Sequence, residues 1–139
     1  MSEKAIVQVR EIMKTKFDTI DGMDLVIDAL KKMEHVETKC LIVNKRHDND
    51  EFGVLLLSDI ARKVLARDLS PERVNVYEVM AIPVISVQPE MDIRFCARLF
   101  DRFDISRAPV VENKSVVGIV SFTDLVIKGF FKKYEESGA

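Results

Sequence analysis

The sequence lacks the features that mark most secreted, membrane-spanning and metal-dependent proteins. It has two cysteines, two histidines and no tryptophan. It contains no apolar window of about 20 residues, which is the length that a transmembrane helix needs. The first residues, MSEKAIVQVREIM, lack the apolar core and the small-residue cleavage site of a signal peptide. We therefore expect a cytoplasmic protein with no membrane partner.

The few cysteines and histidines do not form a reactive or metal-binding pattern. Cys40 and Cys96 both lie in apolar segments, so we expect reduced packing residues in preference to a disulfide. His35 and His47 lack the spacing of zinc ligands, so no metal site is predicted. The sequence also has no glycine-rich nucleotide loop and no nucleophile motif. These absences favour a binding protein over an enzyme.

The charge balance argues against partners that a strong electrostatic field would attract. The 139 residues carry a net charge of −2, so we expect neither nucleic acid nor an anionic membrane as a partner. Hydrophobic residues make up 47% and charged residues 32%, which is the mix of a folded domain. The length suits one compact domain or two small halves that pack together.

What the sequence does contain is an internal repeat. VREIM (Val9–Met13) returns as VYEVM (Val76–Met80), at an offset of 67 residues. At the same offset, two sets of apolar residues share the spacing i, i+3, i+4, i+7, i+10, which predicts one apolar stripe on a helix. The sets are Val26, Ala29, Leu30, Met33 and Val36 in the first copy and Ile93, Cys96, Ala97, Phe100 and Phe103 in the second.

The other segments follow in the same order in both copies. The expected elements, first copy and then second, are opening strands at 17–20 and 84–87, hairpins of 40–43 with 53–59 and of 108–111 with 118–124, and closing helices at 60–68 and 125–134. Aligning the first hairpin strands requires an offset of 68, so one residue is inserted there. Each copy reads strand, helix, strand, strand, helix, which predicts an α/β (α+β) fold of two β-α-β-β-α repeats. We place the repeats at 1–68 and 76–139, with a linker at 69–75, and expect them to share a core.

This tandem repeat resembles a pair of CBS domains, the arrangement called a Bateman module. The resemblance covers the chain from about Val9 to Lys132, and rests on the two V-x-E-h-M openings, the run RAPVV (Arg107–Val111) and the run GIVSFTD (Gly118–Asp124). It implies a regulatory module whose repeats pack about a pseudo-twofold axis and bind AMP, ADP, ATP or S-adenosylmethionine in clefts between them. The sequence leaves open whether Mg²⁺ accompanies ATP. We also expect a homodimer that signals to a separate effector protein.

In that family, the aspartate at the end of the GIVSFTD run holds the ribose hydroxyls, which assigns this role to Asp124. Ser121 and Thr123 would contact ribose or phosphate, and the start of the following helix favours a phosphate. The alternative is that Thr123 or Asp124 simply caps the helix. In the first copy the matching residues are Ser58 and Asp59, but Leu56 replaces Ser121. We therefore expect a weaker or empty site at Asp59.

The resemblance also points to cations for the phosphate. Arg107 precedes the Ala108-Pro109 pair, where related modules carry a basic residue, and its guanidinium suits phosphate. Our alignment sets Lys39 opposite Arg107 and Thr38 opposite Ser106, which adds all four residues to the candidate site. The alternative is that Lys39 and Arg107 are solvated charges at a helix–strand junction.

An adenine ring needs an apolar slot, for which the sequence offers four residues. Ile119 and Val54 follow the two hairpin glycines, and Phe17 and Ile85 lie on the expected opening strands. By the family pattern, Asp124 would share its cleft with Phe17 and Thr38. The alternative is that all four apolar residues belong to the core.

Two other functions compete with ligand sensing. The first is a structural dimerisation or interaction module with vestigial clefts, which Leu56 favours. Phe130 and Phe131 are adjacent, so we expect one of them to point outward on a helix, where an exposed aromatic side chain can mark an interface. The second is an enzyme, which needs a positioned acid, base or nucleophile. Asp59 and Asp124 are the only duplicated candidate carboxylates, and neither has a histidine or thiol beside it, so we expect no catalysis.

Overall fold

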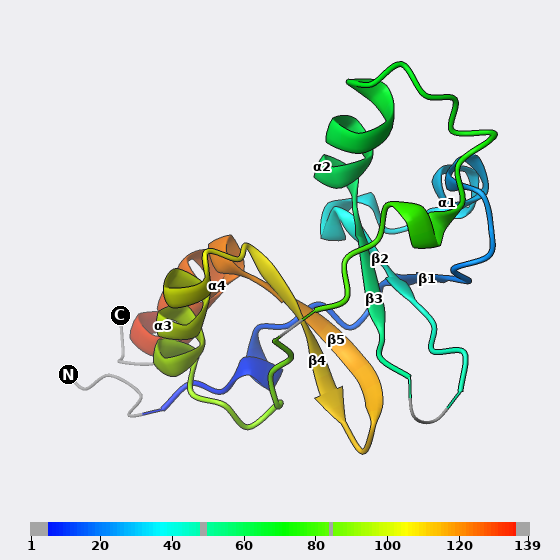
Figure 1. The fold of residues 1–139 in the computed structure, drawn as a ribbon. Coiled ribbons are helices and arrows are strands. Elements are labelled where there is room, and N and C mark those ends of the chain that lie inside the picture. Colours follow the sequence, from blue (N-terminus) through cyan, green and yellow to red (C-terminus); the bar gives the residue numbers. More distant parts are fainter. Residues whose placement is uncertain (1–5, 48–49, 84, 136–139) are drawn as a thin grey trace. The chain divides into compact units, whose positions relative to one another are not determined.

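The computed structural model describes residues 6–47, 50–83 and 85–135 (Figure 1). The chain folds as two compact units. One, here called the Asp59 unit, is Lys16–Val84. The other, the Asp124 unit, combines Met1–Thr15 with Ile85–Ala139. Among the described residues, no helix has both the length and the apolar character to cross a membrane.

The Asp59 unit holds a three-stranded sheet with helices joined to it. Its elements are β1 (Asp18–Ile20), α1 (Val26–Lys32), the 3-10 turn Val36–Thr38, β2 (Cys40–Val43), β3 (Gly53–Leu56), α2 (Leu57–Ile60), the π-helical turn Ala61–Leu65 and the 3-10 turn Val76–Glu78. The strand order is β1-β2-β3, with β1 parallel to β2 and β2 antiparallel to β3. The predicted helix, opening strand and hairpin of the first copy are therefore confirmed, but β3 ends at Leu56, so residues 57–59 of the expected strand already belong to the closing helix.

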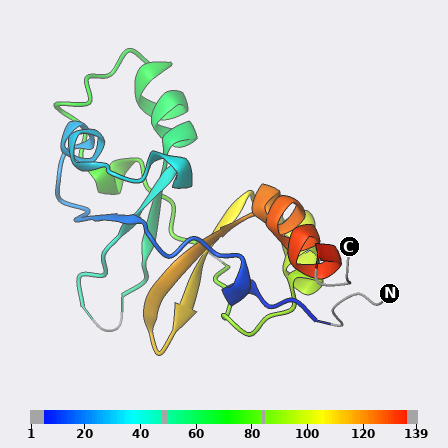
Figure 2. The same ribbon diagram turned by 180° about the vertical axis from the view of Figure 1, so that it is seen from behind.

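The Asp124 unit holds a longer hairpin and two longer helices. Its elements are the 3-10 turn Val9–Glu11, α3 (Ile93–Phe103), β4 (Arg107–Glu112), β5 (Ser115–Ser121) and α4 (Phe122–Glu135). Strands β4 and β5 are antiparallel, and α3 and α4 lie side by side in both views (Figures 1 and 2). The turn between the strands carries positive φ angles at Asn113 and Lys114. The predicted hairpin and both helices of the second copy are confirmed.

The predicted opening strand at 84–87 is wrong for its described residues. Only Val87 pairs with the hairpin, through a single parallel bridge to Val110, and Val84 lies outside the described residues. The reason is the lack of donors on both sides of this bridge. A parallel ladder would next need the N–H of Pro89 on one side and that of Pro109 on the other, and proline has no N–H.

The two V-x-E-h-M segments pack in the unit opposite to their own sequence repeat. The Val9 N–H donates to the Met91 carbonyl at 2.8 Å, and the Val76 N–H donates to the Asp24 carbonyl at 2.8 Å. Each opening segment thus joins the turn just before the helix of the other copy. The compact units therefore differ from the repeats 1–68 and 76–139 by an exchange of opening segments.

Each unit has its own apolar core. In the Asp124 unit the largest fully buried side chain is Phe100, and in the Asp59 unit Leu41 and Leu55 are fully buried. Cys40 and Cys96 are buried and form no disulfide, as predicted. Burial raises the pKa of the Cys96 thiol to about 12.

The ends of the two predicted apolar stripes do not pack. Val36 is 60% exposed and Phe103 is 50% exposed. Helix α1 ends at Lys32, and Met33 is already extended, so Val36 is not on that helix. Helix α3 ends at Phe103 because Asp104 adopts a left-handed conformation.

Candidate functional site at the start of helix α4

Strand β5 passes directly into α4, and the polar residues of the GIVSFTD run lie at this junction. Ser121 and Asp124 are both 7% exposed. The Asp124 N–H donates to the Ser121 Oγ at 3.1 Å, and Ser121 Oγ lies 3.2 Å from Thr123 Oγ1. Ser121 therefore caps the helix, a role that the sequence pattern had suggested for Thr123 or Asp124. This leaves the Asp124 carboxylate without a capping role.

The Asp124 carboxylate instead meets two lysines. Lys14 Nζ lies 2.6 Å from Asp124 Oδ2, and Lys128 Nζ lies 3.8 Å from the same oxygen. The Lys14 side chain is 23% exposed and that of Asp124 11%, so this pair is largely shielded from water. The Lys14 backbone is fixed by two hydrogen bonds of 2.9 Å with Ile119, one in each direction.

Sequence reasoning missed Lys14. Its partner lies 110 residues away, so no local pattern could reveal the pair. A signal was present, however, because the offset of 67 that aligns the openings sets Lys14 opposite Ala81. A charge in one copy and a methyl in the other marks a position where the copies differ in chemistry.

Arg107 and Ser106 lie next to this junction. Arg107 is paired with Ser121 across the hairpin, and the Ser106 carbonyl accepts the Phe122 N–H at 2.8 Å. Arg107 Nη1 donates to Ser106 Oγ at 3.2 Å. Arg107 Nε is buried and has no hydrogen-bond partner among the described residues. Such an unsatisfied donor is uncommon in a folded protein, and a bound acceptor would satisfy it.

The matching junction in the Asp59 unit is poorer in polar groups. Asp59 lies in the first turn of α2, and its carboxylate meets Arg62 Nη1 at 3.3 Å. Leu56 stands at the helix cap without a side-chain hydrogen bond, and Ser58 is exposed. Ala81 pairs with Val54 as Lys14 pairs with Ile119, so the Lys14 position has no cation here.

The strand register corrects our alignment of the cations. Cys40 pairs with Leu56, and Arg107 pairs with Ser121. Because Leu56 and Ser121 are equivalent, Cys40 occupies the place of Arg107, and Lys39 that of Ser106. The offset therefore stays at 67 through this strand. The register shift comes later, between Val110 and Val111.

Lys39 and Thr38 are consequently not the counterparts of Arg107 and Ser106. Thr38 is 2% exposed, and its hydroxyl lies 2.8 Å from the His35 carbonyl and 2.9 Å from the Cys40 carbonyl. Its hydrogen is committed to the backbone of its own unit. Lys39 is exposed and left-handed, with a φ of 59°.

The four residues expected around an adenine lie in different surroundings. Ile119 is 3% exposed and Val54 is 8% exposed, and both belong to bridges with the exchanged segments. Ile85 packs against the core of the Asp124 unit, and Phe17 is half-buried in the Asp59 unit. A cleft shared by Phe17, Thr38 and Asp124 stays a prediction.

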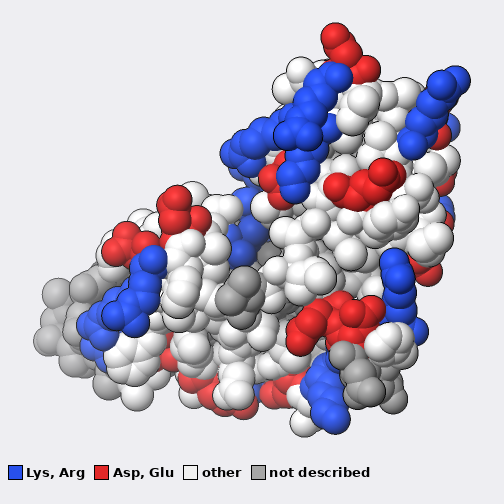
Figure 3. All heavy atoms as spheres, viewed as in Figure 1, with Lys and Arg blue, Asp and Glu red and all other residues white. Residues whose placement is uncertain are grey.

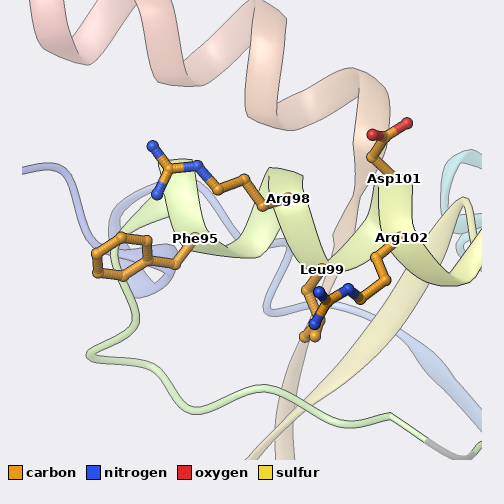
Figure 4. A pocket seen from close by; sticks show the side chains of 5 residues that line it. All are labelled: Phe95, Arg98, Leu99, Asp101 and Arg102. Atoms are coloured by element: carbon orange, nitrogen blue, oxygen red, sulfur yellow. The ribbon is translucent and has the colours of Figure 1, made fainter.

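A separate hollow lies along α3. Its volume is about 450 Å³, and it is lined by Phe95, Arg98, Leu99, Asp101 and Arg102 (Figure 4). The Arg98 guanidinium lies 5.3 Å from the centre of the Phe95 ring. None of the predicted site residues lines this hollow. On the face drawn in Figure 3, each unit carries side chains of both signs, in keeping with the small net charge.

Comparison with known proteins supports the fold of two tandem repeats. The model of the family "CBS domain" matches residues 9–66 and 76–128. A solved structure of a hexameric CBS-CP12 protein from bloom-forming cyanobacteria is 39% identical, with a TM-score of 0.85, over 92% of this chain and 71% of that one.

Two further proteins show the range of the relatives. The CBS domain pair of protein MJ0100, solved in complex with 5-methylthioadenosine and S-adenosyl-L-methionine, is 25% identical, with a TM-score of 0.74, over 92% of this chain and 99% of that one. The mitochondrial CBS domain-containing protein CBSX3 of Arabidopsis thaliana is 27% identical over 85% of this chain and 62% of that protein. The chain spans about three fifths of this relative and of two uncharacterised archaeal relatives.

Proposed function

The chain belongs to the CBS domain family, and we propose that it is a regulatory module that binds an adenosine-containing ligand at the Asp124 junction. The observation that carries this proposal is a buried carboxylate with no capping role at the start of α4. Asp124 lies beside the hydroxyls of Ser121 and Thr123, and Ser121 is paired across the hairpin with Arg107, whose Nε has no partner among the described residues. The ligand classes are AMP, ADP and ATP, the last with Mg²⁺, or S-adenosylmethionine.

The chemistry of this junction suits a nucleoside. A ribose diol donates hydrogen bonds, and an ionised carboxylate is the stronger kind of acceptor for them. Lys14 occupies Asp124 Oδ2 and leaves Oδ1 for a hydroxyl. The N–H groups in the first turn of α4 and the guanidinium of Arg107 suit a phosphate. The related CBS domain pair of MJ0100 was solved with two adenosine compounds, which favours the same ligand class here.

We expect the Asp59 junction to bind weakly or not at all. Its carboxylate is paired with Arg62. Leu56, Cys40 and Ala81 stand there in the places of Ser121, Arg107 and Lys14. The repeats 1–68 and 76–139, joined by 69–75, would then differ in role, with the second repeat supplying the ribose contact. We expect this cytoplasmic module to pass its ligand state to a separate effector protein.

A second candidate function is a structural interaction module, and one observation favours it. The outer face of α4 carries five apolar residues that are 38–63% exposed, namely Phe122, Val126, Ile127, Phe130 and Phe131. An apolar surface of this kind marks interfaces in soluble proteins. We propose that it meets a second copy of the chain in a homodimer, which would accompany either function.

Thermal unfolding of the wild type and of Asp124→Ala tests the ligand proposal. A ligand at a hundredfold its dissociation constant stabilises by about 2.7 kcal/mol, a midpoint shift on the order of 6–12 °C for a chain of this size. We expect AMP, ADP, ATP or S-adenosylmethionine to raise the wild-type midpoint and Asp124→Ala to abolish the rise. If none raises the midpoint of the wild type, the interaction module becomes the better account. Sedimentation of wild type and Val126→Glu would then test the α4 face.

A further inference from the structure

The Lys14–Asp124 pair lies at the atom where the proposed ligand would bind. Lys14 Nζ is 2.6 Å from Asp124 Oδ2, and the two side chains are 23% and 11% exposed. Exposed ion pairs contribute little to stability, but this pair is largely shielded from water, so Lys14 is more than a solvated charge. Its ammonium is a compact point charge on a flexible stem, so it can act on a ligand as well as on the carboxylate.

The charges of this junction do not cancel. Asp124 is one negative group, and it meets Lys14 and, at 3.8 Å, Lys128. Arg107 adds a third cation at the neighbouring strand end, where its Nε has no partner among the described residues. Two lysines on one carboxylate leave an excess of one positive charge, to which Arg107 at the strand end adds a second, and a phosphate would neutralise this excess.

The Asp59 junction lacks the counterparts of Lys14 and Arg107. Ala81 stands in the place of Lys14, and Cys40 stands in the place of Arg107. Lys63, the counterpart of Lys128 at the offset of 65, donates its Nζ to the Val79 carbonyl at 3.3 Å. Only Arg62 meets the Asp59 carboxylate among the contacts of the described residues. Lys39 stands in the place of Ser106, but no lysine contacts the Asp59 carboxylate among the described residues. The close lysine on the aspartate carboxylate is therefore a property of one repeat, and Lys14 supplies it.

We propose that Lys14 is the specificity-determining residue of the Asp124 junction and makes it select adenosine ligands with a 5′-phosphate. This inference rests on the proposed adenosine site. The 5′-phosphate lies one sugar ring away from the hydroxyls that Asp124 would accept, so a cation on the same carboxylate lies near it. Uncharged adenosine gains nothing from this cation. S-adenosylmethionine carries a sulfonium, which the excess positive charge repels.

Isothermal titration of AMP, adenosine and S-adenosylmethionine tests this selection. We expect the wild type to bind AMP at least about tenfold more tightly than adenosine. Lys14→Met removes the charge and keeps the length of the side chain, so the preference for AMP should fall about tenfold, the equivalent of one charge-assisted contact of about 1.4 kcal/mol. Lys14→Arg should retain it. The exposed neighbour Lys16 supplies the control, and Lys16→Met should behave as the wild type.

The neutral variants should fold, because Ala81 makes the same pair of backbone hydrogen bonds as Lys14 without a charge. Lys14→Gln is a second neutral variant, and the thermal midpoint of each variant without ligand checks its folding. An unchanged ratio of AMP to adenosine affinity in both neutral variants would overturn the inference. An equal rise in the affinity for AMP and for adenosine in the neutral variants would also overturn it, since Lys14 would then only compete with the ribose for the Asp124 carboxylate.

Asp124→Ala separates this inference from the proposed function. If Asp124→Ala weakens every adenosine compound but the neutral Lys14 variants keep the preference, the adenosine site stands and the role of Lys14 fails. If the wild type binds adenosine or S-adenosylmethionine more tightly than AMP, the selection is also wrong. If the wild type binds none of the three, both the site and the selection are wrong.

Discussion

The two strand-to-helix junctions share one backbone plan and differ in their side chains. In both, a hairpin strand runs into a helix whose first turn carries an aspartate, and an exchanged opening segment bridges the same strand. The Asp124 junction carries Ser121, Arg107 and Lys14 where the other carries Leu56, Cys40 and Ala81. A duplicated fold has thus kept the geometry in both copies and the polar chemistry in one.

The matched glycines Gly118 and Gly53 give the largest expected difference. A Cβ at Gly118 would lie 2.9 Å from the Lys14 carbonyl, which is backbone that cannot easily move. A Cβ at Gly53 would lie 2.7 Å from Sδ of the flexible Met80 side chain and 3.1 Å from Val43 Cβ, and neither of these atoms is backbone. Gly118→Ala should cost about 1–3 kcal/mol in the free energy of unfolding, and Gly53→Ala clearly less.

Urea denaturation of both glycine variants measures this difference. A larger loss of stability in Gly53→Ala would mean that the Lys14–Ile119 bridge is not packed more tightly than the Ala81–Val54 bridge. Gly118→Ala should also weaken AMP binding, because the clash pushes Lys14 away from its place.

The helix caps give a smaller difference. Ser121 Oγ accepts the Asp124 N–H, so Ser121→Ala should cost about 1 kcal/mol in the free energy of unfolding. Leu56 makes no such bond. Leu56→Ser therefore offers a gain of a cap against a loss of apolar packing, and we expect a net change within about 1 kcal/mol. Chemical denaturation with far-ultraviolet circular dichroism follows both, and a neutral Ser121→Ala would exclude the cap.

The matched core residues Cys96 and Ala29 give the smallest difference. Burial raises the pKa of the Cys96 thiol from an ordinary value of 9.0 to about 12. Above about pH 9, only the unfolded chain loses this proton, so stability falls as the pH rises toward 12. The loss should stay below about 1 kcal/mol at about pH 9.5. Cys96→Ala, which copies Ala29, should remove this part of the slope, and denaturant unfolding at pH 7 and 9.5 compares the two chains. An identical slope in both chains would contradict the shift.

Much of the fold can be predicted from the sequence because the repeat consists of local patterns of apolar residues. The stripe from Val26 to Met33 and that from Ile93 to Phe100 predict the helices, and glycine-led apolar runs predict the hairpins. The prediction of an opening strand at 84–87 is wrong because a run of apolar residues does not indicate whether backbone N–H donors are available. Pro89 and Pro109 lack the N–H groups that would extend the ladder on both sides of Val87. The exchange of opening segments rests on long-range backbone bonds that leave no local pattern.

The part of the candidate site that lies in a local sequence pattern was predicted. Asp124, Ser121 and Thr123 lie in one short run, and the structure brings them together with Arg107. The alignment of Lys39 with Arg107 is wrong by one residue, because CLIV and APVV are both apolar and hydrophobicity alone does not fix a register. Lys14 was missed because its partner Asp124 lies 110 residues away in the sequence.

One measurement tests the central claim, that a single junction of the pair binds the ligand. Calorimetric titration of AMP would be run on the wild type, Asp124→Asn and Asp59→Asn. We predict one AMP per wild-type chain, an unchanged affinity in Asp59→Asn, and a loss of roughly ten- to a hundredfold in Asp124→Asn, the equivalent of about 1.5–3 kcal/mol. Two AMP per chain, or a loss in Asp59→Asn with Asp124→Asn unchanged, would contradict it.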